Sequence, residues 1–483
     1  PLKTTHRLVA ATIASSALAF AGCTADPEPG LLAGQDCLVI VLDALSADHL
    51  GTYGGHPEAS PTLDALAAKG VQFQQAWSQS SWTLASTASL MTGLYQESHM
   101  ADEAGQALHP DADTLAESFR IEGYECIGLT QNLFASEDFG MHQGFDNFVP
   151  MMQDAKKDGF MAKAVIKQLE GQGTRGPRFV YAHFRRPHAP YDPPAETLEM
   201  FYEGTYSGPV TGSPKDLHLH NRGAVPLGPQ DLDYLRALYD AGIRAVDDEL
   251  KTIFDTIDMD NTLVIVLADH GDAFNQHGIL GHGQTSFEEM VHIPMLAAHP
   301  SLGKGVVVRD PVMSVDLFPT VAELFGLPTG GAELAGRSLV PELMGETQEQ
   351  RLVFTSSRVD QGKQQFAVFD GRHKLILCPE LDKRVLYDLR KDPAEAKNLA
   401  GVHPNLASRL EQEIADWRAT QSPLPRIPAK RLKHDSPHAL LMRIATGELK
   451  LDRLGGYSVE KGKFKWIRAQ PLLPNAVEKP TTA

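Results

Sequence analysis

The chain has 483 residues, 42% of them hydrophobic and 22% charged, which is the composition of a globular protein with room for one large core and a smaller second one. The formal net charge is -17 at pH 7, and because a protein that neutralises nucleic-acid phosphates needs a basic surface, this charge argues against a nucleic-acid partner. A local basic funnel would still admit a small anionic substrate, since groups inside a cleft outweigh a distant, salt-screened net charge.

The first segment has the features of an export signal. Lys3 and Arg7 precede an apolar run that is too short to span a bilayer. Small residues just before Cys23 resemble a bacterial lipoprotein processing site, which implies a signal peptide over 1–22, a lipidated thiol on Cys23 and a tether over 23–35. We therefore expect a periplasmic or cell-envelope lipoprotein that meets the membrane only through this anchor; an ordinary signal with a fortuitous cysteine is the alternative.

Continuous apolar runs predict strands that are buried on both faces of a parallel sheet. These runs are residues 37–42, 124–129, 178–183 and 262–267. Helical stretches such as 112–121 and 232–257 lie between them, so we expect a doubly wound α/β domain over 36–345, with a mostly parallel sheet and helices on both faces. Ligands of such sheets gather beyond the carboxyl ends of the strands, where a site is to be sought.

The pattern changes from about residue 351. Short strands with tight connections follow at 366–369, 374–377 and 385–387, and a helix ends near Trp417. We expect a small C-terminal antiparallel sheet with one helix over 350–418. Residues 419–483 are rich in proline and basic residues and show no sustained periodicity, so they are expected to wrap the domain or to be partly disordered.

Carboxylates and an imidazole follow two of the predicted strands. Asp43 ends the first run, and Asp269 and His270 directly follow the strand at 262–267. Such groups at neighbouring strand ends would form a divalent metal site, whereas an isolated aspartate there is often a turn or cap residue.

Several segments, in order, resemble the sulfatase family within the alkaline phosphatase superfamily. They are residues 41–45 with 47–54, 81–93, 187–191, 268–271 with 277–278 and 281–283, 315–320, and 386–389 with 392–393 and 398–399. The match extends over roughly residues 35 to 417. The resemblance implies a metal-dependent hydrolase of small anionic esters with the alkaline phosphatase-like fold.

The nucleophile segment departs from that family's pattern. Most members have Cys or Ser, any residue, Pro, any residue, Arg, and the first residue is oxidised to formylglycine. Counting back from Thr92 and Gly93 places Thr83 at the nucleophile and Thr87 at the arginine. Threonine cannot become formylglycine, and a threonyl ester must be resolved by attack of water or an acceptor, which is usual in phosphoryl transfer. Thr83 also opens a helix expected over 83–90, whose positive end would favour an alkoxide and an anion; a plain helix N-cap is the alternative.

The resemblance implies one divalent ion, of which Ca, Mn, Mg and Zn are all candidates. We expect Asp43, Thr83, Asp269 and His270 to bind it. The family's second aspartate, beside the first, is Ala44 here.

Further residues are candidates for contact with the substrate. His188 and His282 stand where the family places substrate-binding groups, and either would be able to protonate the leaving oxygen. Arg186, Thr87 and Asn132 are further expected substrate contacts, and the arginine would add a positive field.

These observations predict a hydrolase of phosphate esters, above all phosphodiesters or phosphonate esters, or of sulfate esters, with Thr83 as nucleophile. The alternatives are a formylglycine-independent sulfatase, a phospho-headgroup transferase, and an inactive binding protein on the same scaffold.

Overall fold

The computed structural model describes residues 30–152, 158–170, 176–331, 333–359, 363–429, 456–460 and 463–467. The predicted signal peptide and Cys23 lie outside these ranges, so export and the lipid anchor stay predictions. Within the ranges, the search for a helix both long and apolar enough to cross a membrane finds none.

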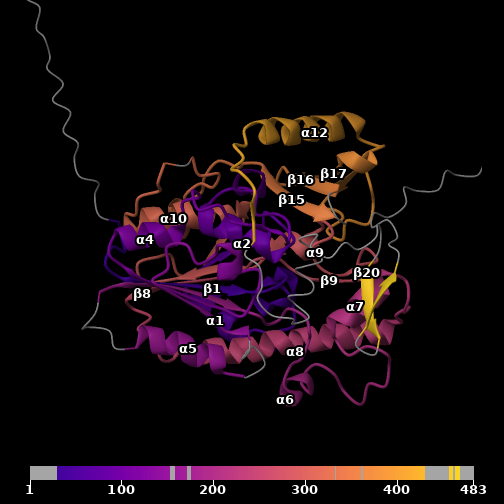
Figure 1. The fold of residues 1–483 in the computed structure, drawn as a ribbon, viewed down its shortest axis with the longest axis horizontal. Coiled ribbons are helices and arrows are strands. Elements are labelled where there is room, and N and C mark those ends of the chain that lie inside the picture. Colours follow the sequence, from indigo (N-terminus) through magenta and orange to yellow (C-terminus); the bar gives the residue numbers. More distant parts are fainter. Residues whose placement is uncertain are drawn as a thin grey trace, which may run out of the picture.

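A mixed sheet forms the centre of the molecule (Figure 1). Its strands are β1 (Asp36–Leu42), β2 (Val71–Phe73), β5 (Glu125–Thr130), β6 (Asn147–Pro150), β7 (Arg178–Phe184), β8 (Thr262–Ala268), β12 (Met295–Ala298) and β13 (Val306–Val308). The eight strands lie in the order β13-β2-β12-β8-β1-β7-β5-β6. Strand β12 is antiparallel to both of its neighbours, and the other neighbours are parallel. The four apolar runs predicted as strands are the adjacent strands β8, β1, β7 and β5, which confirms the expected fold class.

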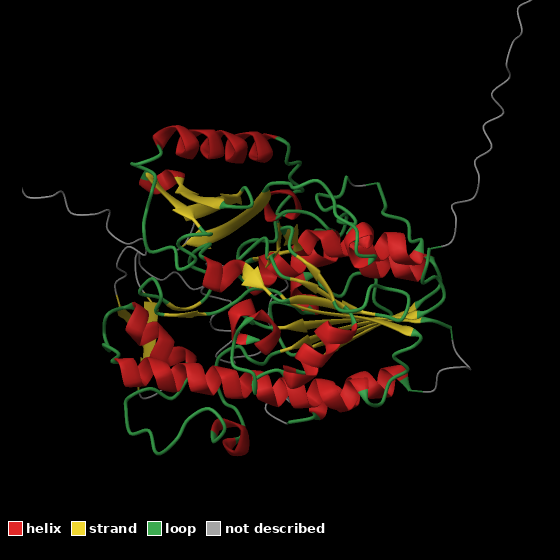
Figure 2. Cartoon of the chain, turned by 180° about the vertical axis from the view of Figure 1, so that it is seen from behind, coloured by secondary structure: helices red, strands yellow, loops and turns green. Residues whose placement is uncertain are grey.

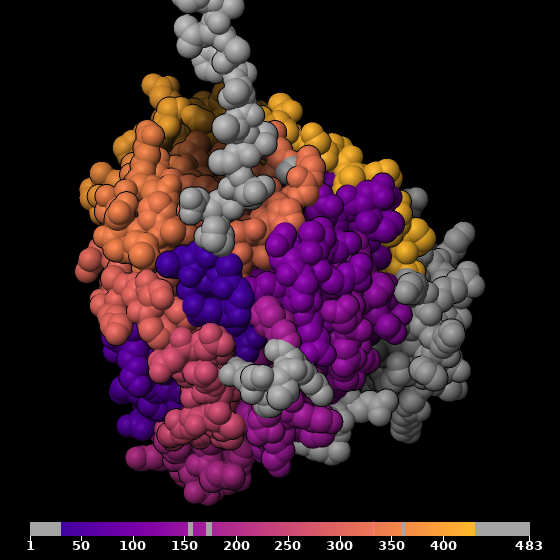
Figure 3. All heavy atoms as spheres, turned by 90° about the vertical axis from the view of Figure 1, so that its left-hand side faces the viewer, coloured from indigo at the N-terminus to yellow at the C-terminus, as the bar shows by residue number. Residues whose placement is uncertain are grey.

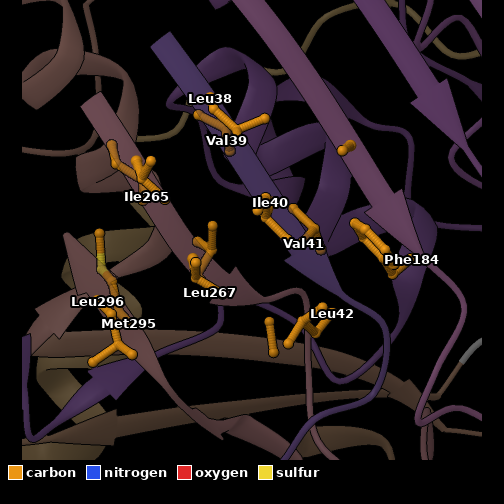
Figure 4. Packing of buried hydrophobic residues seen from close by; sticks show 14 of the residues in the cluster. Leu38, Val39, Ile40, Val41, Leu42, Phe184, Ile265, Leu267, Met295 and Leu296 are labelled. Atoms are coloured by element: carbon orange, nitrogen blue, oxygen red, sulfur yellow. The ribbon is translucent and has the colours of Figure 1, made fainter. Parts of the chain in front are cut away.

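Strand β1 is buried along its whole length. Figure 4 shows Ile40 and Val41 with Leu267 of β8 on one side and Phe184 of β7 on the other. In register, Leu42 pairs with Ala268 of β8 and with Phe184 of β7, so the three strands end at the same level. The residues that follow them therefore emerge together at one edge of the sheet.

Helices cover both faces of this sheet, as Figures 1 and 2 show. One face carries α5 (Phe160–Leu169) and α8 (Pro229–Phe254), and the other carries α2 (Thr83–Thr92), α4 (Leu115–Ile121) and α10 (Leu317–Phe325). The helix expected over 232–257 is α8. The helix expected from residue 112 is α4, which begins only at Leu115 because Thr114 and Glu117 form a capping box there.

The remaining elements of the central domain are short. They are the helices α1 (Pro61–Lys69), α3 (Gln96–His99), α6 (Ala195–Leu198), α7 (Pro214–Asn221), α9 (Glu288–Val291) and α11 (Val340–Leu343), the 3-10 turns Ala47–His49, Gly51–Tyr53, Glu137–Phe139 and Ser314–Asp316, and the strands β3 (Ala76–Trp77), β4 (Gln106–Ala107), β9 (Ala273–Phe274), β10 (Leu280–Gly281), β11 (His292–Ile293) and β14 (Val312–Met313). A further 3-10 turn, Pro379–Leu381, lies in the C-terminal subdomain.

A second, antiparallel sheet follows in the order β15-β16-β17-β18. Its elements are β15 (Val353–Val359), β16 (Lys363–Phe369), β17 (His373–Cys378), β18 (Lys383–Asp388) and the covering helix α12 (Pro404–Ala419). In Figure 2 this helix lies on the outer side of the sheet, away from the central domain. The three expected strands are β16, β17 and β18. Strand β15 was not predicted, because the sequence rule looks for apolar residues and Thr355, Ser356 and Ser357 are polar, although all three are buried.

After α12 the chain returns to the central domain, and residues 421–429 form what we call the strap. The strap includes β19 (Ile427–Pro428), which pairs antiparallel with β4. Its Arg426 forms an ion pair with the buried Asp102, which also binds Arg358 of β15. Figure 3 shows this last described part of the main chain, in gold, along the purple surface of residues near 100. Further on, β20 (Gly456–Glu460) pairs antiparallel with β21 (Lys463–Ile467).

Candidate active site

Three strand ends bring two carboxylates and an imidazole together. Asp43 follows β1, His183 is the penultimate residue of β7, and Asp269 follows β8. One ligand atom from each lies within 4.8 Å of the others, and all three residues are fully buried. The His183 Nε2 atom is 3.6 Å from Asp43 Oδ2 and 3.8 Å from Asp269 Oδ2. These distances leave a space between the three side chains that a single cation would fill.

Backbone and side-chain donors fix the two carboxylates. Asp269 Oδ1 accepts hydrogen bonds from the backbone N–H groups of Ala44 at 3.0 Å and of His270 at 2.9 Å. Asp43 Oδ2 accepts a hydrogen bond from the side-chain amide of Asn132. The other oxygens, Asp43 Oδ1 and Asp269 Oδ2, are buried and have no hydrogen-bond partner in the described part of the chain. Buried carboxylate oxygens without partners are costly, so their presence points to a bound cation.

His183 is oriented by the hydroxyl of Tyr181, which is 2.9 Å from its Nδ1 atom. When Nδ1 carries the proton and donates to that hydroxyl, Nε2 keeps a free lone pair towards the carboxylates. Among the described residues, Nε2 has no hydrogen-bond partner. Burial pushes the pKa of His183 down, but Asp43 and Asp269 outweigh it and the pKa is raised. The protonation state of His183 therefore depends on the charges of Asp43 and Asp269.

Neighbouring histidines shift the pKa of the Asp43 carboxyl in turn. Burial alone would raise the pKa of its carboxyl, but His188, His183 and His270 outweigh burial and lower it. Asp43 is therefore ionised at neutral pH, as a metal ligand must be.

Thr83 is the first residue of α2, whose N-cap is Trp82. The N-cap residue of α2 is therefore Trp82, and Thr83 is not the plain N-cap that was its alternative role. Thr83 Oγ1 is 3.1 Å from His270 Nε2 and 3.5 Å from the amide nitrogen of Asn132. The hydroxyl therefore sits at the positive end of a helix, beside the buried carboxylates.

His270 faces Thr83 with a lone pair. Its Nδ1 atom lies 3.0 Å from the carbonyl oxygen of Gly271, to which it donates, so Nε2 is unprotonated in the neutral ring. Burial lowers the pKa of His270, which keeps the ring neutral. The same Nε2 atom is 3.5 Å from Asp269 Oδ2 and 3.9 Å from Asp43 Oδ1. It is thus placed either to complete a cation site or to accept the Thr83 proton.

The side-chain amide of Asn132 contacts both Asp43 and Thr83. The backbone N–H of Phe134 donates to Asn132 Oδ1 at 2.7 Å, which fixes the amide so that its nitrogen points to Asp43 and Thr83. Asn132 therefore presents a hydrogen-bond donor to the nucleophile candidate.

The His282 ring lies against both His270 and His188, tilted by 36° and 55° to them. The ring centroid of His282 is 4.2 Å from that of His270 and 4.8 Å from that of His188. Asp272 Oδ1 is 2.6 Å from His282 Nδ1, and its other oxygen accepts a hydrogen bond from the Tyr191 hydroxyl at 2.9 Å. Burial lowers the pKa of His282, but Asp272 outweighs it and the pKa is raised. The Asp272 carboxylate thus fixes the proton on Nδ1 and sets the orientation of the ring.

Two expected substrate contacts are placed differently. The guanidinium of Arg186 binds the carboxylate of Asp158 and, at 3.1 Å, the carbonyl oxygen of Asp192. The structure therefore shows its hydrogen-bonding nitrogens engaged outside the Thr83 group. Thr87 lies one turn after Thr83 on α2, where it is fully buried, and in the described part of the chain its hydroxyl has no hydrogen-bond partner.

Two residues of this group were missed by sequence reasoning. His183 was included in a strand but not considered as a ligand, although a lone imidazole next to the end of an apolar run was a usable signal. Asp272 follows Asp269 by three positions and His270 by two, and its only signal was that proximity. His183 also lies close to Asp43, where the neighbouring Ala44 supplies no ligand atom.

Comparisons with known proteins identify the family of the chain. A family model described as Sulfatase matches residues 35–327, and a second, described as N-sulphoglucosamine sulphohydrolase, C-terminal, matches residues 277–420. The Delta 4,5-hexuronate-2-O-sulfatase of Bacteroides thetaiotaomicron is 24% identical over an alignment of 430 residues, which covers 80% of this chain and 87% of that protein. The multifunctional alkaline phosphatase superfamily protein PehA of Trinickia caryophylli is 23% identical and matches 80% of this chain and 96% of its own length.

Solved structures show the same fold. The phosphonate monoester hydrolase of Agrobacterium radiobacter superposes with a TM-score of 0.67 at 23% identity, covering 80% of this chain and 95% of that one. A putative sulfatase from Bacteroides thetaiotaomicron also has a TM-score of 0.67, at 21% identity, and covers 84% of this chain and 96% of its own.

Proposed function

Because the chain belongs to the sulfatase family and is an ester hydrolase of that family, we propose that it cleaves its ester with Thr83 as the nucleophile. One observation carries the proposal: the Thr83 hydroxyl lies at the start of α2, 3.1 Å from His270 and within reach of Asn132, beside the buried Asp43, His183 and Asp269 group. An alcohol is barely ionised at neutral pH, and this setting provides both an acceptor for its proton and a donor for the resulting oxyanion.

The donor set fits one divalent cation. Asp43, His183 and Asp269 each offer a buried atom that has no hydrogen-bond partner among the described residues, and carboxylate oxygens with imidazole nitrogens suit Mn, Zn, Mg or Ca in different degrees. We propose that His183 supplies the ligand that is missing at Ala44, that Thr83 completes the set, and that His270 Nε2 accepts the Thr83 proton. A divalent cation bound there would stabilise an alkoxide and polarise the ester oxygens.

The side chains of the chain then have distinct roles. Thr83 Oγ1 forms a bond to phosphorus or sulfur while the bond to the leaving oxygen breaks. Asn132 donates a hydrogen bond to the Thr83 oxygen. His270 Nε2 takes the Thr83 proton as the threonyl ester forms and returns it when that ester is cleaved. His282, oriented by Asp272, protonates the leaving oxygen and in the second step takes a proton from the attacking water, whose oxygen cleaves the threonyl ester. His188 packs against His282 and is partly exposed, so it is placed to contact the substrate.

The preferred substrates under this proposal are phosphodiesters or phosphonate esters. A hydrated aldehyde can release sulfate by collapse, whereas a threonyl ester has no such route and needs attack at the central atom. The names of the similar proteins include both a phosphonate monoester hydrolase and sulfatases, so a sulfatase that works without formylglycine is the second candidate.

The test is turnover of matched 4-nitrophenyl esters of phosphate, phosphodiester, phosphonate and sulfate by the metal-loaded protein. Thr83→Ala should lower turnover by several orders of magnitude, and Thr83→Ser should keep appreciable activity because it retains the hydroxyl. Thr92→Ala is the matched control, because it removes a buried hydroxyl from the other end of the same helix, where the hydroxyl donates to the Ala88 carbonyl at 2.7 Å and accepts from the Leu94 backbone N–H at 3.2 Å.

Acid quench followed by peptide mass analysis should show the adduct on Thr83. An adduct on another residue, or near-native turnover by Thr83→Ala, would exclude Thr83 as the nucleophile.

A further inference from the structure

We propose that Trp82 and Phe134 form an aromatic wall beside the nucleophile, and that this wall binds the organic part of the ester through an uncharged ring with an apolar face. The proposal rests on the proposed function, since the wall adjoins Thr83, and it adds the chemical class of the substrate.

The wall is attached to the site through its neighbours in the sequence. Trp82 directly precedes Thr83, and the indole packs edge-on against Phe134 with ring centroids 5.1 Å apart. The backbone N–H of Phe134 holds the Asn132 amide, which points to Thr83. A Cβ atom placed on Gly283, next to His282, would lie 3.9 Å from Trp82 Cδ1. The indole therefore lies between the Asn132 turn and the His282 loop.

Both rings are supported from behind and remain partly accessible in front. They pack on a buried cluster that includes Leu84 and Ala88 of α2 and Phe139. Phe134 is further fixed by a ring contact with Phe139 at 5.1 Å. Their side chains are half-buried, whereas Trp77 and Trp417 of the same chain are only 2% and 8% exposed. Rigid, half-exposed aromatic rings offer a large apolar contact at little cost in conformational entropy.

The surroundings offer little to a second anionic group. The guanidinium of Arg185 donates to the carbonyl oxygens of His188 at 3.1 Å and Pro190 at 2.9 Å and to the Asp192 carboxylate at 2.5 Å. The Arg186 guanidinium is likewise bound to Asp158. These two arginines, which follow β7, thus already form ion pairs with Asp192 and Asp158, and the whole chain carries a net charge of -17. A neutral ring suits this flank better than a further sulfate or carboxylate.

Calorimetric binding of two phosphonates to the metal-loaded protein tests the proposal without turnover. Phenylphosphonate and methylphosphonate present the same anion and differ in the ring. Wild type should bind phenylphosphonate about tenfold more tightly, which corresponds to the usual value of an aromatic contact. Trp82→Ala should remove most of that preference and leave methylphosphonate binding nearly unchanged, Phe134→Ala should reduce it, and Trp82→Phe should keep most of it. Thermal unfolding of each variant identifies any loss of the fold.

The outcomes separate this inference from the proposed function. An unchanged preference in both alanine variants, or equal weakening of both phosphonates, would overturn the aromatic wall and leave Thr83 chemistry standing. Failure of wild type to bind either phosphonate would overturn the anion site of the proposed function and this inference with it. An adduct on a residue other than Thr83 would overturn the proposed nucleophile alone.

Discussion

Asp269→Asn should reverse the order of stability between wild type and variant when the divalent ion is removed. The ligand oxygens of Asp43 and Asp269 lie within 4.8 Å of each other. Two unit charges at that distance repel by about 3 kcal/mol at an effective dielectric constant of about 20. Without a cation, and at a pH above the pKa of His183 where its ring is neutral and does not offset the two charges, that repulsion destabilises wild type, and the substitution removes it. The asparagine oxygen can still accept the hydrogen bonds from Ala44 and His270.

With the ion present, the opposite order is expected. A ligand that binds only the folded state adds about 4.1 kcal/mol to the free energy of unfolding at a concentration about 1,000 times its Kd, which exceeds the repulsion of about 3 kcal/mol. Wild type should gain this amount, and the variant should gain much less because it has lost one of the two anionic ligands. In chelator, therefore, the variant should be the more stable protein, by up to the 3 kcal/mol of the repulsion.

Urea unfolding in chelator and in excess Mn²⁺ measures both effects, and elemental analysis should find one ion per wild-type chain. Asp247→Asn is the matched control, because Asp247 is buried and accepts two backbone hydrogen bonds from Thr62 and Leu63 at 2.8 and 2.9 Å, apart from the ligand group. Its effect should be the same with and without the ion. An equal gain from the ion in wild type and Asp269→Asn, or two ions per chain, would refute the single cation site.

Three further predictions concern other parts of the structure. Asn132→Ala should lower kcat by about 100-fold with a smaller change in KM, because the donor to the Thr83 oxygen is lost. A rise in KM as large as the fall in kcat would contradict this role. Burial raises the pKa of Asp247 to about 6, so the folded state holds this proton more tightly than the unfolded one. The contribution of Asp247 to the free energy of unfolding should be complete below about pH 4 and lost as the pH rises through about 6, and Asp247→Asn should flatten this part of the stability profile from urea unfolding. Asp102→Ala should free Arg426 and speed proteolytic cleavage within the strap; an unchanged cleavage rate would show that the ion pair does not hold it.

Most of the central fold could be predicted from sequence because buried parallel strands are continuous apolar runs. The same rule failed for β15, whose buried Thr355, Ser356 and Ser357 read as a loop. The site residues Asp43, Asp269 and His270 could be predicted for a related reason, since parallel strands end at one edge of the sheet and the residues after them lie together. His183 could not, because a lone histidine in an apolar run is usually a core residue, and only the register of β7 against β1 places it beside Asp43. A sequence also shows that Arg186 is charged without showing that Asp158 will pair with it.

The ligand group takes one residue from each of three strands that are far apart in the chain, and this spacing governs when the site can exist during synthesis. Ala44 and Asp269, which share a hydrogen bond, are 225 positions apart. At ribosomal rates of about 5–20 residues per second, roughly 10–45 s separate their appearance. A nascent chain that ends before β8 has Asp43 and His183 but lacks the second carboxylate. The proposed cation site therefore lacks one carboxylate in every shorter chain, and a cation would bind the complete group only after the central strands have docked.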